Sequence, residues 1–440
     1  MSDYMFILES HLSAEQNTVL AAVQAAAAEA NLSLFLTGGA MRDMLGGFPI
    51  RDLDFTVEGP ALKLAKDMAK HGIAEILQID DHRKTAEVLF PNGVRSEIGM
   101  ARQEKYGKPG AKPQITAATV HEDLRGRDFT INAIALSLNR ASRGLMIDPT
   151  NGASDLERKE LRAISNYSLY DDPVRLLRLI RFKARLGFTI DERTLQQFNN
   201  AREAGMEKYI PGRALFGELR QIALEANPYD ILKELEDVGL LKLFSPALEG
   251  AKLNAPAFQK ISKSKAMIPF GTSFHVDWYG LSMYCITQLL AAKEKTQLIE
   301  TMKMTKEEID PWQKLDARAK KLEAVLKSAK LSKASQVFAV LQKAPGEETM
   351  LLFLKSTERL VQDRIKNYFT KYLATAMDVT DAEVTQATGL EPTSPKFAKA
   401  KDDRINAHLD GRIRKPAPPP EPEPAPAPPP KGMVRGSRFR

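Results

Sequence analysis

Two aspartates separated by one residue, Asp52 and Asp54, are the side chains of this 440-residue sequence best suited to metal chemistry. They flank the start of an apolar, β-prone run at 53–57, and alternate residues of a strand point to the same face. Two carboxylates without a lysine between them are oxygen ligands of the kind that Mg²⁺ prefers. In a site with two such ions, one activates an attacking hydroxyl and the other holds a triphosphate and its leaving pyrophosphate. Because Asp-x-Asp also occurs by chance at turns, its surroundings decide its meaning.

A turn with paired glycines precedes the aspartates. The segment TGGAMRD at 37–43 places Gly38 and Gly39 between an apolar run and a helical stretch. Glycines let the backbone approach a phosphate closely, and the start of a helix favours negative charge. Arg42, in the first turn of that helix, carries a planar guanidinium that suits phosphate oxygens. An ordinary strand-to-helix turn is the alternative, but the order strand, paired glycines, helix, strand and Asp-x-Asp favours a triphosphate site.

A helix expected from about residue 172 carries an aspartate and arginines at every third position. Asp172 and Arg175 are neighbours on such a helix and can hold each other's side chains in place. A carboxylate beside a planar donor fork presents both acceptors and donors, which suits the edge of a base. The alternative is the solvated basic edge of an amphipathic helix. The row continues with Arg178 and Arg181, and its expected buried face is Leu176, Leu177, Leu179 and Ile180.

Glu97, in the β-prone run 94–101, is a candidate third carboxylate. It can point toward the same metal if its strand is a neighbour of the strand that carries the aspartates. An exposed charge at the edge of a sheet explains this residue equally well. Both interpretations stay open at this stage.

Short strand-like runs alternate with helical stretches over roughly the first hundred residues, which indicates a small mixed sheet of α+β type. Residues 13–30 begin with Ser13 and Gln16 at capping-box spacing and predict a helix. The other expected elements are strands at 32–37, 53–57, 73–79, 85–90 and 94–101, and helices at about 39–46 and 61–71.

From about residue 120 the pattern changes to helix. Apolar residues recur with a period near 3.6 in 129–138, 173–188 and 214–226, which predicts a helix in each. Beyond 228 nearly every segment is typical of helix or loop, so we expect an all-α C-terminal half. The stretch 416–430 is rich in proline and predicts an extended spacer. The short basic tail after it is either a solvated end or an arm that touches a phosphate backbone.

The composition excludes several classes of protein. A net charge of +7 suits a polyanionic partner only weakly. The single cysteine, Cys285, lies in an apolar stretch, so we expect a buried small hydrophobe in a reducing compartment. No Cys/His spacing matches a zinc site, and the absence of His-Asp and His-x-x-x-His pairs argues against a metal phosphohydrolase. Without a signal sequence or an apolar run near 18 residues, we expect a cytoplasmic protein.

The run GGAMRDMLGGFPIRDLDF at 38–55 resembles the first motif of the class II CCA-adding enzyme and bacterial poly(A) polymerase family, in the polymerase-beta nucleotidyltransferase superfamily. The resemblance is strong over about 32–190 and fainter beyond it, although 390–413 resembles a closing motif of the tail domain. Four later segments of this sequence resemble the family's further motifs and follow in the family's order. They are ARQEKYGKPGAKP (101–113), DLRGRDFTINAIAL (123–136), DPTNGASDLERKELRAI (148–164) and DDPVRLLRLIRFKARLGF (171–188).

Three positions depart from the family's pattern. Gly126 stands where the first arginine of an Arg-Arg-Asp motif is usual, so one phosphate or RNA contact is in doubt. Asp171 stands where glutamate is usual, and Gly212 stands in place of an expected glutamate in a loosely matched helical motif. None of the three touches the aspartate pair, so they put nucleotide specificity in doubt rather than catalysis.

The resemblance implies template-independent, metal-dependent addition of CMP and AMP to the 3′ end of tRNA, with release of pyrophosphate. It implies Asp52 and Asp54 as catalytic ligands of two Mg²⁺ ions, and CTP and ATP as substrates. Asp172 and Arg175 would select the base, and Glu97 is a candidate third metal ligand. The further expected nucleotide contacts are Gly38, Gly39, Arg42, Arg127, Arg178 and Arg181.

The implied fold is α+β, with an N-terminal mixed-sheet nucleotidyltransferase head followed by an all-α neck, body and tail. The helical parts are expected to bind the acceptor stem and elbow of tRNA; neither DNA nor a membrane is an expected partner, and homo-oligomerisation stays open. The expected boundaries are a head at 1–150, a nucleotide-selecting neck at 151–228, an RNA-binding body at 229–365, a tail at 366–413, and a disordered proline-rich spacer with a basic C-terminus at 414–440.

Other activities within the family stay open as alternatives. They are poly(A) polymerisation and A-only addition to tRNA, whereas the loop at 80–84, a candidate lever for switching from C to A, disfavours CC-only addition. From a different class, the chain could be an RNA-binding protein whose catalytic head has decayed. The intact aspartate pair and the arginine row speak against that alternative.

Overall fold

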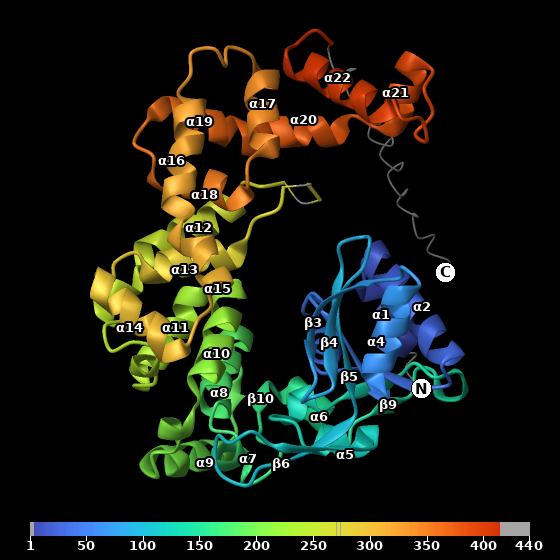
Figure 1. The fold of residues 1–440 in the computed structure, drawn as a ribbon, viewed down its shortest axis with the longest axis vertical. Coiled ribbons are helices and arrows are strands. Elements are labelled where there is room, and N and C mark those ends of the chain that lie inside the picture. Colours follow the sequence, from blue (N-terminus) through green and yellow to red (C-terminus); the bar gives the residue numbers. More distant parts are fainter. Residues whose placement is uncertain (1–3, 270, 273, 414–440) are drawn as a thin grey trace, which may run out of the picture. The chain divides into compact units, whose positions relative to one another are not determined.

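A seven-stranded mixed sheet forms the centre of the N-terminal part (Figure 1). The computed structural model describes residues 4–413 except 270 and 273, so the spacer and basic tail expected at 414–440 lie outside the described residues. The strand order is β3-β4-β5-β2-β1-β8-β9; β2 and β5 run parallel, and the other neighbouring strands are antiparallel. The strands are β1 Ser33–Thr37, β2 Leu53–Glu58, β3 Glu75–Asp80, β4 Thr85–Leu89, β5 Arg95–Met100, β8 Ala135–Ser137 and β9 Met146–Ile147.

Alternation along β2 gives the sheet two different faces. Leu53, Phe55 and Val57 are buried, whereas Asp54 lies on the other face and is only half-buried. Helices α1 (Tyr4–His11), α2 (Ala14–Glu29) and α4 (Ala61–Lys70) lie on one side of the sheet in Figure 1. Helix α2 begins at Ser13 with the expected capping box, since Ser13 accepts from the backbone of Gln16 and Gln16 accepts in return. The sheet and these helices confirm the α+β class.

The helix expected at 129–138 is wrong. A single 3-10 turn, η1 (Thr130–Asn132), is followed by strand β8, which pairs antiparallel with β1. Residues 128–138 are buried on every side, so their apolar pattern carries no periodicity that separates helix from strand. The segment becomes a strand because β8 pairs with the free edge of β1. The sheet therefore includes residues beyond 120, where the sequence predicted only helix.

The helix expected from about residue 172 begins later than predicted. Helix α8 starts at Arg175, and Asp172 lies before it in a non-helical conformation with φ −127° and ψ 87°. A residue that precedes proline avoids the α region, and Pro173 follows Asp172. The expected buried face is confirmed, because Leu176, Leu177, Leu179 and Ile180 are at most 2% exposed.

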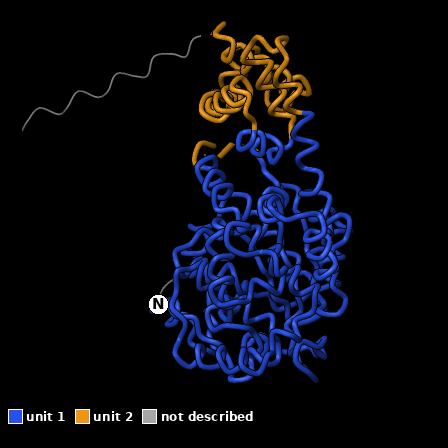
Figure 2. Tube along the Cα trace, turned by 90° about the vertical axis from the view of Figure 1, so that its left-hand side faces the viewer, with its two compact units in different colours: residues 1–265, 275–321, 345–355 blue, residues 266–274, 322–344, 356–440 orange. Residues whose placement is uncertain are grey.

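The rest of the chain is mainly helical and divides into two compact units (Figure 2). One unit comprises 1–265, 275–321 and 345–355 and holds the large sheet; the other comprises 266–274, 322–344 and the residues from 356 onward. No helix of the described residues is long and apolar enough to cross a membrane. Cys285 is buried as expected, and burial raises the pKa of its thiol to about 12.

The remaining elements complete the two units. Two small sheets pair β6 (Arg102–Lys105) with β7 (Gln114–Ala117) and β10 (Glu160–Leu161) with β11 (Thr189–Ile190). The helices of the first unit are α3 Gly39–Leu45, α5 Val120–Arg125, α6 Gly152–Arg158, α7 Ser168–Asp171, α8 Arg175–Leu186, α9 Glu192–Glu203, α10 Gly212–Leu224, α11 Pro228–Asp237, α12 Ala255–Lys265, α13 Trp278–Thr287, α14 Ala292–Met302, α15 Lys306–Gln313 and α18 Gly346–Lys355. Helix α16 (Leu315–Leu326) runs into the second unit, which holds α17 Ala334–Lys343, α19 Arg359–Asn367, the π-helix Tyr368–Tyr372, α20 Leu373–Asp378, α21 Asp381–Thr388 and α22 Phe397–Leu409.

Candidate active site

One cavity of about 930 Å³ gathers every residue that the sequence singled out for a site. Its walls come from strands β1, β2 and β5, helix α3, helix α8 and helix α10, all in the first unit. The structure therefore brings together residues that are up to 143 positions apart, while their individual roles remain predictions. The expected residues that line the cavity are Gly38, Gly39, Arg42, Asp52, Asp54, Glu97, Arg127, Asp172, Arg175, Arg178 and Arg181.

Three carboxylates come together at the parallel pair of strands. Asp52 immediately precedes β2, Asp54 is its second residue, and Glu97 of β5 is the register partner of Asp54. Strand β5 is flanked by β2 and β4, so Glu97 does not lie at the edge of the sheet. The sheet-edge part of that alternative is therefore wrong, although Glu97 is exposed as the alternative expected. Its place beside Asp54 follows from the strand order, which the sequence did not reveal.

The electrostatics of these carboxylates favour a bound cation. Burial raises the pKa of Asp52, Asp54 and Glu97, and the charges of Glu97 and Asp52 contribute to raising the pKa of Asp54 to about 7. By solvent accessibility, Asp54 is half-buried, whereas Asp52 and Glu97 are exposed. A divalent cation beside Asp54 would offset the repulsion from these two neighbouring carboxylates. Their hard oxygen donors fit Mg²⁺, and Asp52 and Asp54 are the residues that would hold it.

The protein alone does not enclose a metal ion. Among the described residues, no group of three or more His, Cys, Asp or Glu side chains is arranged to hold one. Mg²⁺ typically takes one or two carboxylates and completes its shell with water and substrate phosphates. The donor set here is of that open type, which leaves room for a phosphorylated substrate.

The glycine turn brings the backbone close to these groups. Gly38 caps α3 with φ 64°, a conformation that favours glycine. A Cβ at this position would lie 2.9 Å from Nη1 of Arg127 and 3.7 Å from Oδ2 of Asp54. Any side chain at Gly38 would therefore be strained and would occupy the space between the arginine and the aspartate.

Arg127 is anchored on the floor of the cavity. Its guanidinium donates to the Asp123 carboxylate at 2.9 Å and to the Thr37 and Thr56 hydroxyls at 3.1 and 3.3 Å. These contacts tie helix α5 to strands β1 and β2 directly beside Asp54. Because its donors are largely occupied, Arg127 supplies a fixed positive charge at this point rather than a mobile arm.

The Asp172–Arg175 pair lies at the start of α8. Nη1 of Arg175 donates to the Ser168 hydroxyl at 2.7 Å and to the Arg127 carbonyl at 3.2 Å, which fixes the guanidinium. Its Nε lies 3.7 Å from Oδ2 of Asp172 and is buried without a hydrogen-bond acceptor. The pair therefore combines a fixed guanidinium with a carboxylate acceptor, and a combination of this kind suits the edge of a base.

The other arginines of α8 are not a solvated edge, which corrects that alternative. They belong to a closed arginine–carboxylate ring whose members touch at 2.8–3.5 Å. The ring balances its positive and negative charges and ties α3 and the segment 128–132 to α8 and α10. Its members in order are Arg42, Asn132, Asp128, Arg178, Glu218, Arg181, Glu225, Arg185 and Asp43, which closes on Arg42.

Burial within the ring differs between its arginines. The side chain of Arg178 is 33% exposed, whereas that of Arg181 is 7% exposed and contacts both Glu218 and Glu225. Burial alone would raise the pKa of the Glu218 carboxyl, but Arg181 and Arg178 bring it below its ordinary value. An expected contact between Arg181 and a triphosphate would require one of these buried ion pairs to open.

The carboxylates of the ring were missed at the sequence level. Glu218 and Glu225 are seven residues apart, hence on one side of a helix, opposite arginines spaced by three and four. That complementary spacing is a usable signal only when α8 and α10 are known to be neighbours. Asp43 and Arg185 likewise find each other only in the folded chain, at 3.0 Å.

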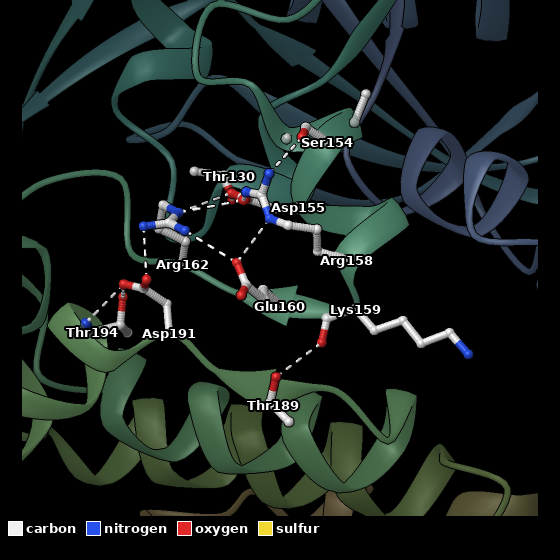
Figure 3. A network of polar contacts seen from close by, with 12 residues as sticks. Thr130, Ser154, Asp155, Arg158, Lys159, Glu160, Arg162, Thr189, Asp191 and Thr194 are labelled. Atoms are coloured by element: carbon white, nitrogen blue, oxygen red, sulfur yellow. Dashed lines mark hydrogen bonds and ion pairs between the residues drawn. The ribbon is translucent and has the colours of Figure 1, made fainter.

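A second polar network fixes the base of α6 beside the 3-10 turn (Figure 3). Asp155 is 1% exposed; it accepts from Thr130 at 2.6 Å and pairs with Arg158 and Arg162. Arg162 also pairs with Asp191 at 2.8 Å, at the start of α9. The network thus joins the turn before β8 to helices α6 and α9.

Gly126, the departure from the expected Arg-Arg-Asp motif, has a structural role in the chain as it stands. Its carbonyl accepts from Nη2 of Arg175 at 3.1 Å. A Cβ at Gly126 would meet only ordinary contacts, the nearest at 3.4 Å from the Asp123 carbonyl. The site therefore has room for a side chain at this position and lacks the cation expected there.

Comparisons with known proteins cover the head most strongly. Residues 34–162 match a family model described as the poly A polymerase head domain. An A-adding tRNA nucleotidyltransferase of Geobacter sulfurreducens is 34% identical over 53% of this chain and 27% of its own length. A multifunctional CCA protein of Teredinibacter turnerae is 33% identical over 49% of this chain and 51% of its own. The chain thus spans about a quarter to a half of the length of these relatives.

The fold is also similar to a solved structure over nearly the whole chain. A CCA-adding enzyme in an apo form matches with a TM-score of 0.55 and 25% sequence identity. The match covers 94% of this chain and 96% of that one. The likeness therefore extends beyond the head into the helical remainder.

Proposed function

We propose that this chain, whose residues 34–162 match the poly A polymerase head domain, is a tRNA nucleotidyltransferase that extends the 3′ end of tRNA with nucleotides from CTP or ATP. The observation that carries the proposal is one cavity in which Asp52 and Asp54 share the walls with the Asp172–Arg175 pair. The first group suits the triphosphate and its metal, and the second suits the base. The names of the two relatives add support.

In the proposed reaction, the 3′-hydroxyl of the RNA gives up its proton to solvent and its oxygen bonds to the α-phosphorus of the nucleotide. The bond from that phosphorus to the bridging oxygen breaks, and pyrophosphate leaves with the electron pair. When bound at Asp52 and Asp54, Mg²⁺ would stabilise the charge on the phosphate oxygens. The protein contributes position and charge: Arg127 fixes a cation beside the phosphates, and Arg175 orients the base.

Complete CCA addition is the finer proposal, and A-only addition is the second candidate. The turn between β3 and β4, which corresponds to the expected lever at 80–84, is present and favours an enzyme that handles both bases. The A-adding relative favours the second candidate. We further propose that the helices beyond 228 bind the acceptor stem and elbow of tRNA by shape and backbone contact.

A primer-extension assay tests these proposals. tRNA transcripts that end before CCA, after C and after CC are incubated with Mg²⁺ and with CTP, ATP or both. Complete CCA addition predicts incorporation of C on the first two transcripts and of A on the third. Incorporation restricted to A on the third transcript would assign A-only addition, long A tracts on unrelated RNA would assign poly(A) synthesis, and no incorporation on any transcript would leave an RNA-binding protein.

A further inference from the structure

The cavity is lined by arginines and by no lysine, and one arginine differs from the others. Each of the others lies within 3.7 Å of a carboxylate oxygen, the longest contact being that of Arg175. The exception is Arg220 of α10, which has no ion pair or hydrogen bond among the described residues and is exposed. The paired arginines are Arg42, Arg51, Arg83, Arg95, Arg102, Arg127, Arg175, Arg178, Arg181 and Arg185.

This difference matters for a ligand that carries negative charge. A phosphate that approaches one of the paired arginines competes with a carboxylate already in place. A phosphate that approaches Arg220 displaces only water and meets a guanidinium with all its donors unused. The charge of Arg220 helps to lower the pKa of Glu308, but that carboxylate is itself paired with Arg213 at 2.7 Å.

Arg220 stands on a stripe of α10 that is open along its length. Positions 217, 220, 221 and 224 fall on one side of a helix, and Arg220, Gln221 and Leu224 all line the cavity. Leu224 is 42% exposed, and a Cβ on Gly217 would meet nothing within 4 Å. The stripe therefore combines a cation, an amide, an apolar side chain and free space.

We propose that this stripe, Gly217, Arg220, Gln221 and Leu224, binds the single-stranded 3′ end of the RNA, with a backbone phosphate on Arg220 and a base against Leu224. The inference rests on the proposed function, because it supplies the second substrate of the same cavity. Single-stranded nucleic acid is bound by a cation for the backbone together with apolar contact for the bases, and the stripe offers both. A triphosphate has no use for the leucine, which favours the RNA over the nucleotide.

The test compares the full-length wild type with Arg220→Ala and with Arg193→Ala. Arg193 is an exposed arginine of α9 for which no partner exists among the described residues, so it controls for loss of surface charge. Binding of a tRNA transcript that ends in CC, and of the same transcript cut back to a blunt acceptor stem, is measured without nucleotide over a range of KCl concentrations. The KM for ATP is measured on the CC transcript.

For the CC transcript, Arg220→Ala is expected to weaken binding about tenfold. The slope of log K against log salt should fall by about 0.7, the value for one phosphate of a single strand. The blunt transcript should bind both proteins alike, Arg193→Ala should match the wild type, and Arg220→Lys should restore the slope. Leu224→Ala should weaken binding of the CC transcript without changing the slope.

Three results would overturn the inference. An unchanged slope for Arg220→Ala means that no phosphate lies on this residue. An equal loss of affinity for both transcripts would mean that Arg220 contacts the tRNA body instead of the 3′ end. A raised KM for ATP with normal RNA binding would mean that Arg220 contacts the triphosphate. A wild type that adds no nucleotide would refute the proposed function separately, because the salt slopes are read without catalysis.

Discussion

Asp128 shows how a single charged residue of the site is held by partners from distant parts of the chain. Its carboxylate accepts from Asn132 at 2.9 Å and pairs with Arg178 at 3.0 Å. Burial alone would raise its pKa, but the charges of Arg178 and Arg175 outweigh burial and lower the pKa to about 2. The residue therefore serves as a member of the arginine–carboxylate ring.

This pKa predicts an acid-sensitive contribution to stability. A carboxyl group whose pKa is lowered on folding stabilises the fold above its unfolded value of 3.8, and the contribution is lost as the pH falls toward 2. The shift corresponds to roughly 2 kcal/mol. Urea unfolding of the wild type should therefore lose about that much more free energy between pH 5 and pH 2 than unfolding of Asp128→Asn. Parallel pH profiles for the two proteins would contradict the assignment.

Arg175 carries the prediction for base selection. Its Nε is the buried donor without an acceptor, next to Asp172. Removing a hydrogen bond from a charged group costs about 1.5–3 kcal/mol, so Arg175→Ala should reduce the preference between CTP and ATP by about tenfold or more. The ratio of kcat/KM values measures this, with tRNA affinity and the unfolding midpoint as controls. A variant that weakens tRNA binding and keeps its C/A ratio would count against a role in selection.

At the scale of elements, the ring makes α3, α8 and α10 act as one support. Glu225 is 4% exposed and accepts from Arg181, Arg185 and Arg51, the residue directly before Asp52. Asp52, the proposed metal ligand, is thereby linked through one carboxylate to the helix that begins with Arg175. Such a link can hold Asp52 in position without any movement of the helices.

Glu225→Gln tests this support. The variant leaves buried guanidinium groups without their counter-charge, which typically costs 3–5 kcal/mol of stability. Because Arg51 loses its anchor, kcat should also fall by about tenfold or more while tRNA affinity persists. A double-mutant cycle with Arg51→Ala should give a coupling energy of at least about 0.5 kcal/mol.

Glu203→Gln, at an exposed position on α9, is the matched control for this experiment. Its kcat and its unfolding midpoint should equal those of the wild type. Additive effects of Arg51→Ala and Glu225→Gln would show that the ion pair does not support Asp52. A stability loss with full kcat would confine Glu225 to folding.

The success of prediction from sequence also differs between elements. Strands β1 to β5 and the capping box of α2 were predictable because alternation and capping are local signals. Strand β8 was missed because a segment buried on all sides has no informative period. The start of α8 was placed too early because the effect of Pro173 on Asp172 was overlooked, although that effect is local.

Prediction of the candidate site from the sequence also succeeded only in part. Its members could be chosen from the spacing of glycines, aspartates and arginines together with the resemblance to the CCA-adding family, and all of them line one cavity. Their partners could not be chosen, since Glu218, Glu225 and Asp43 meet the arginines only through helix packing. Pairing decides which arginines are free for a ligand, so Arg220 could be recognised only in the folded chain.

At the scale of the whole molecule, the proposed division of labour places chemistry in the head and most RNA affinity in the helices beyond 228. A hairpin RNA that keeps only the acceptor stem and its CC end lacks the elbow. Because affinity for structured RNA comes from many backbone contacts, we expect its KM to rise about tenfold or more above that of full-length tRNA. Its kcat should change little, since the reacting end is intact. Equal KM values would contradict elbow binding.

The most direct test of the account concerns Asp54. Incorporation of labelled CMP and AMP into a tRNA transcript that ends before CCA is measured for the wild type with Mg²⁺, for the wild type with EDTA, and for Asp54→Asn with Mg²⁺. The account predicts incorporation only in the first reaction, with tRNA binding unchanged in the variant. Incorporation by Asp54→Asn at the wild-type rate, or none by the wild type with Mg²⁺, would contradict it.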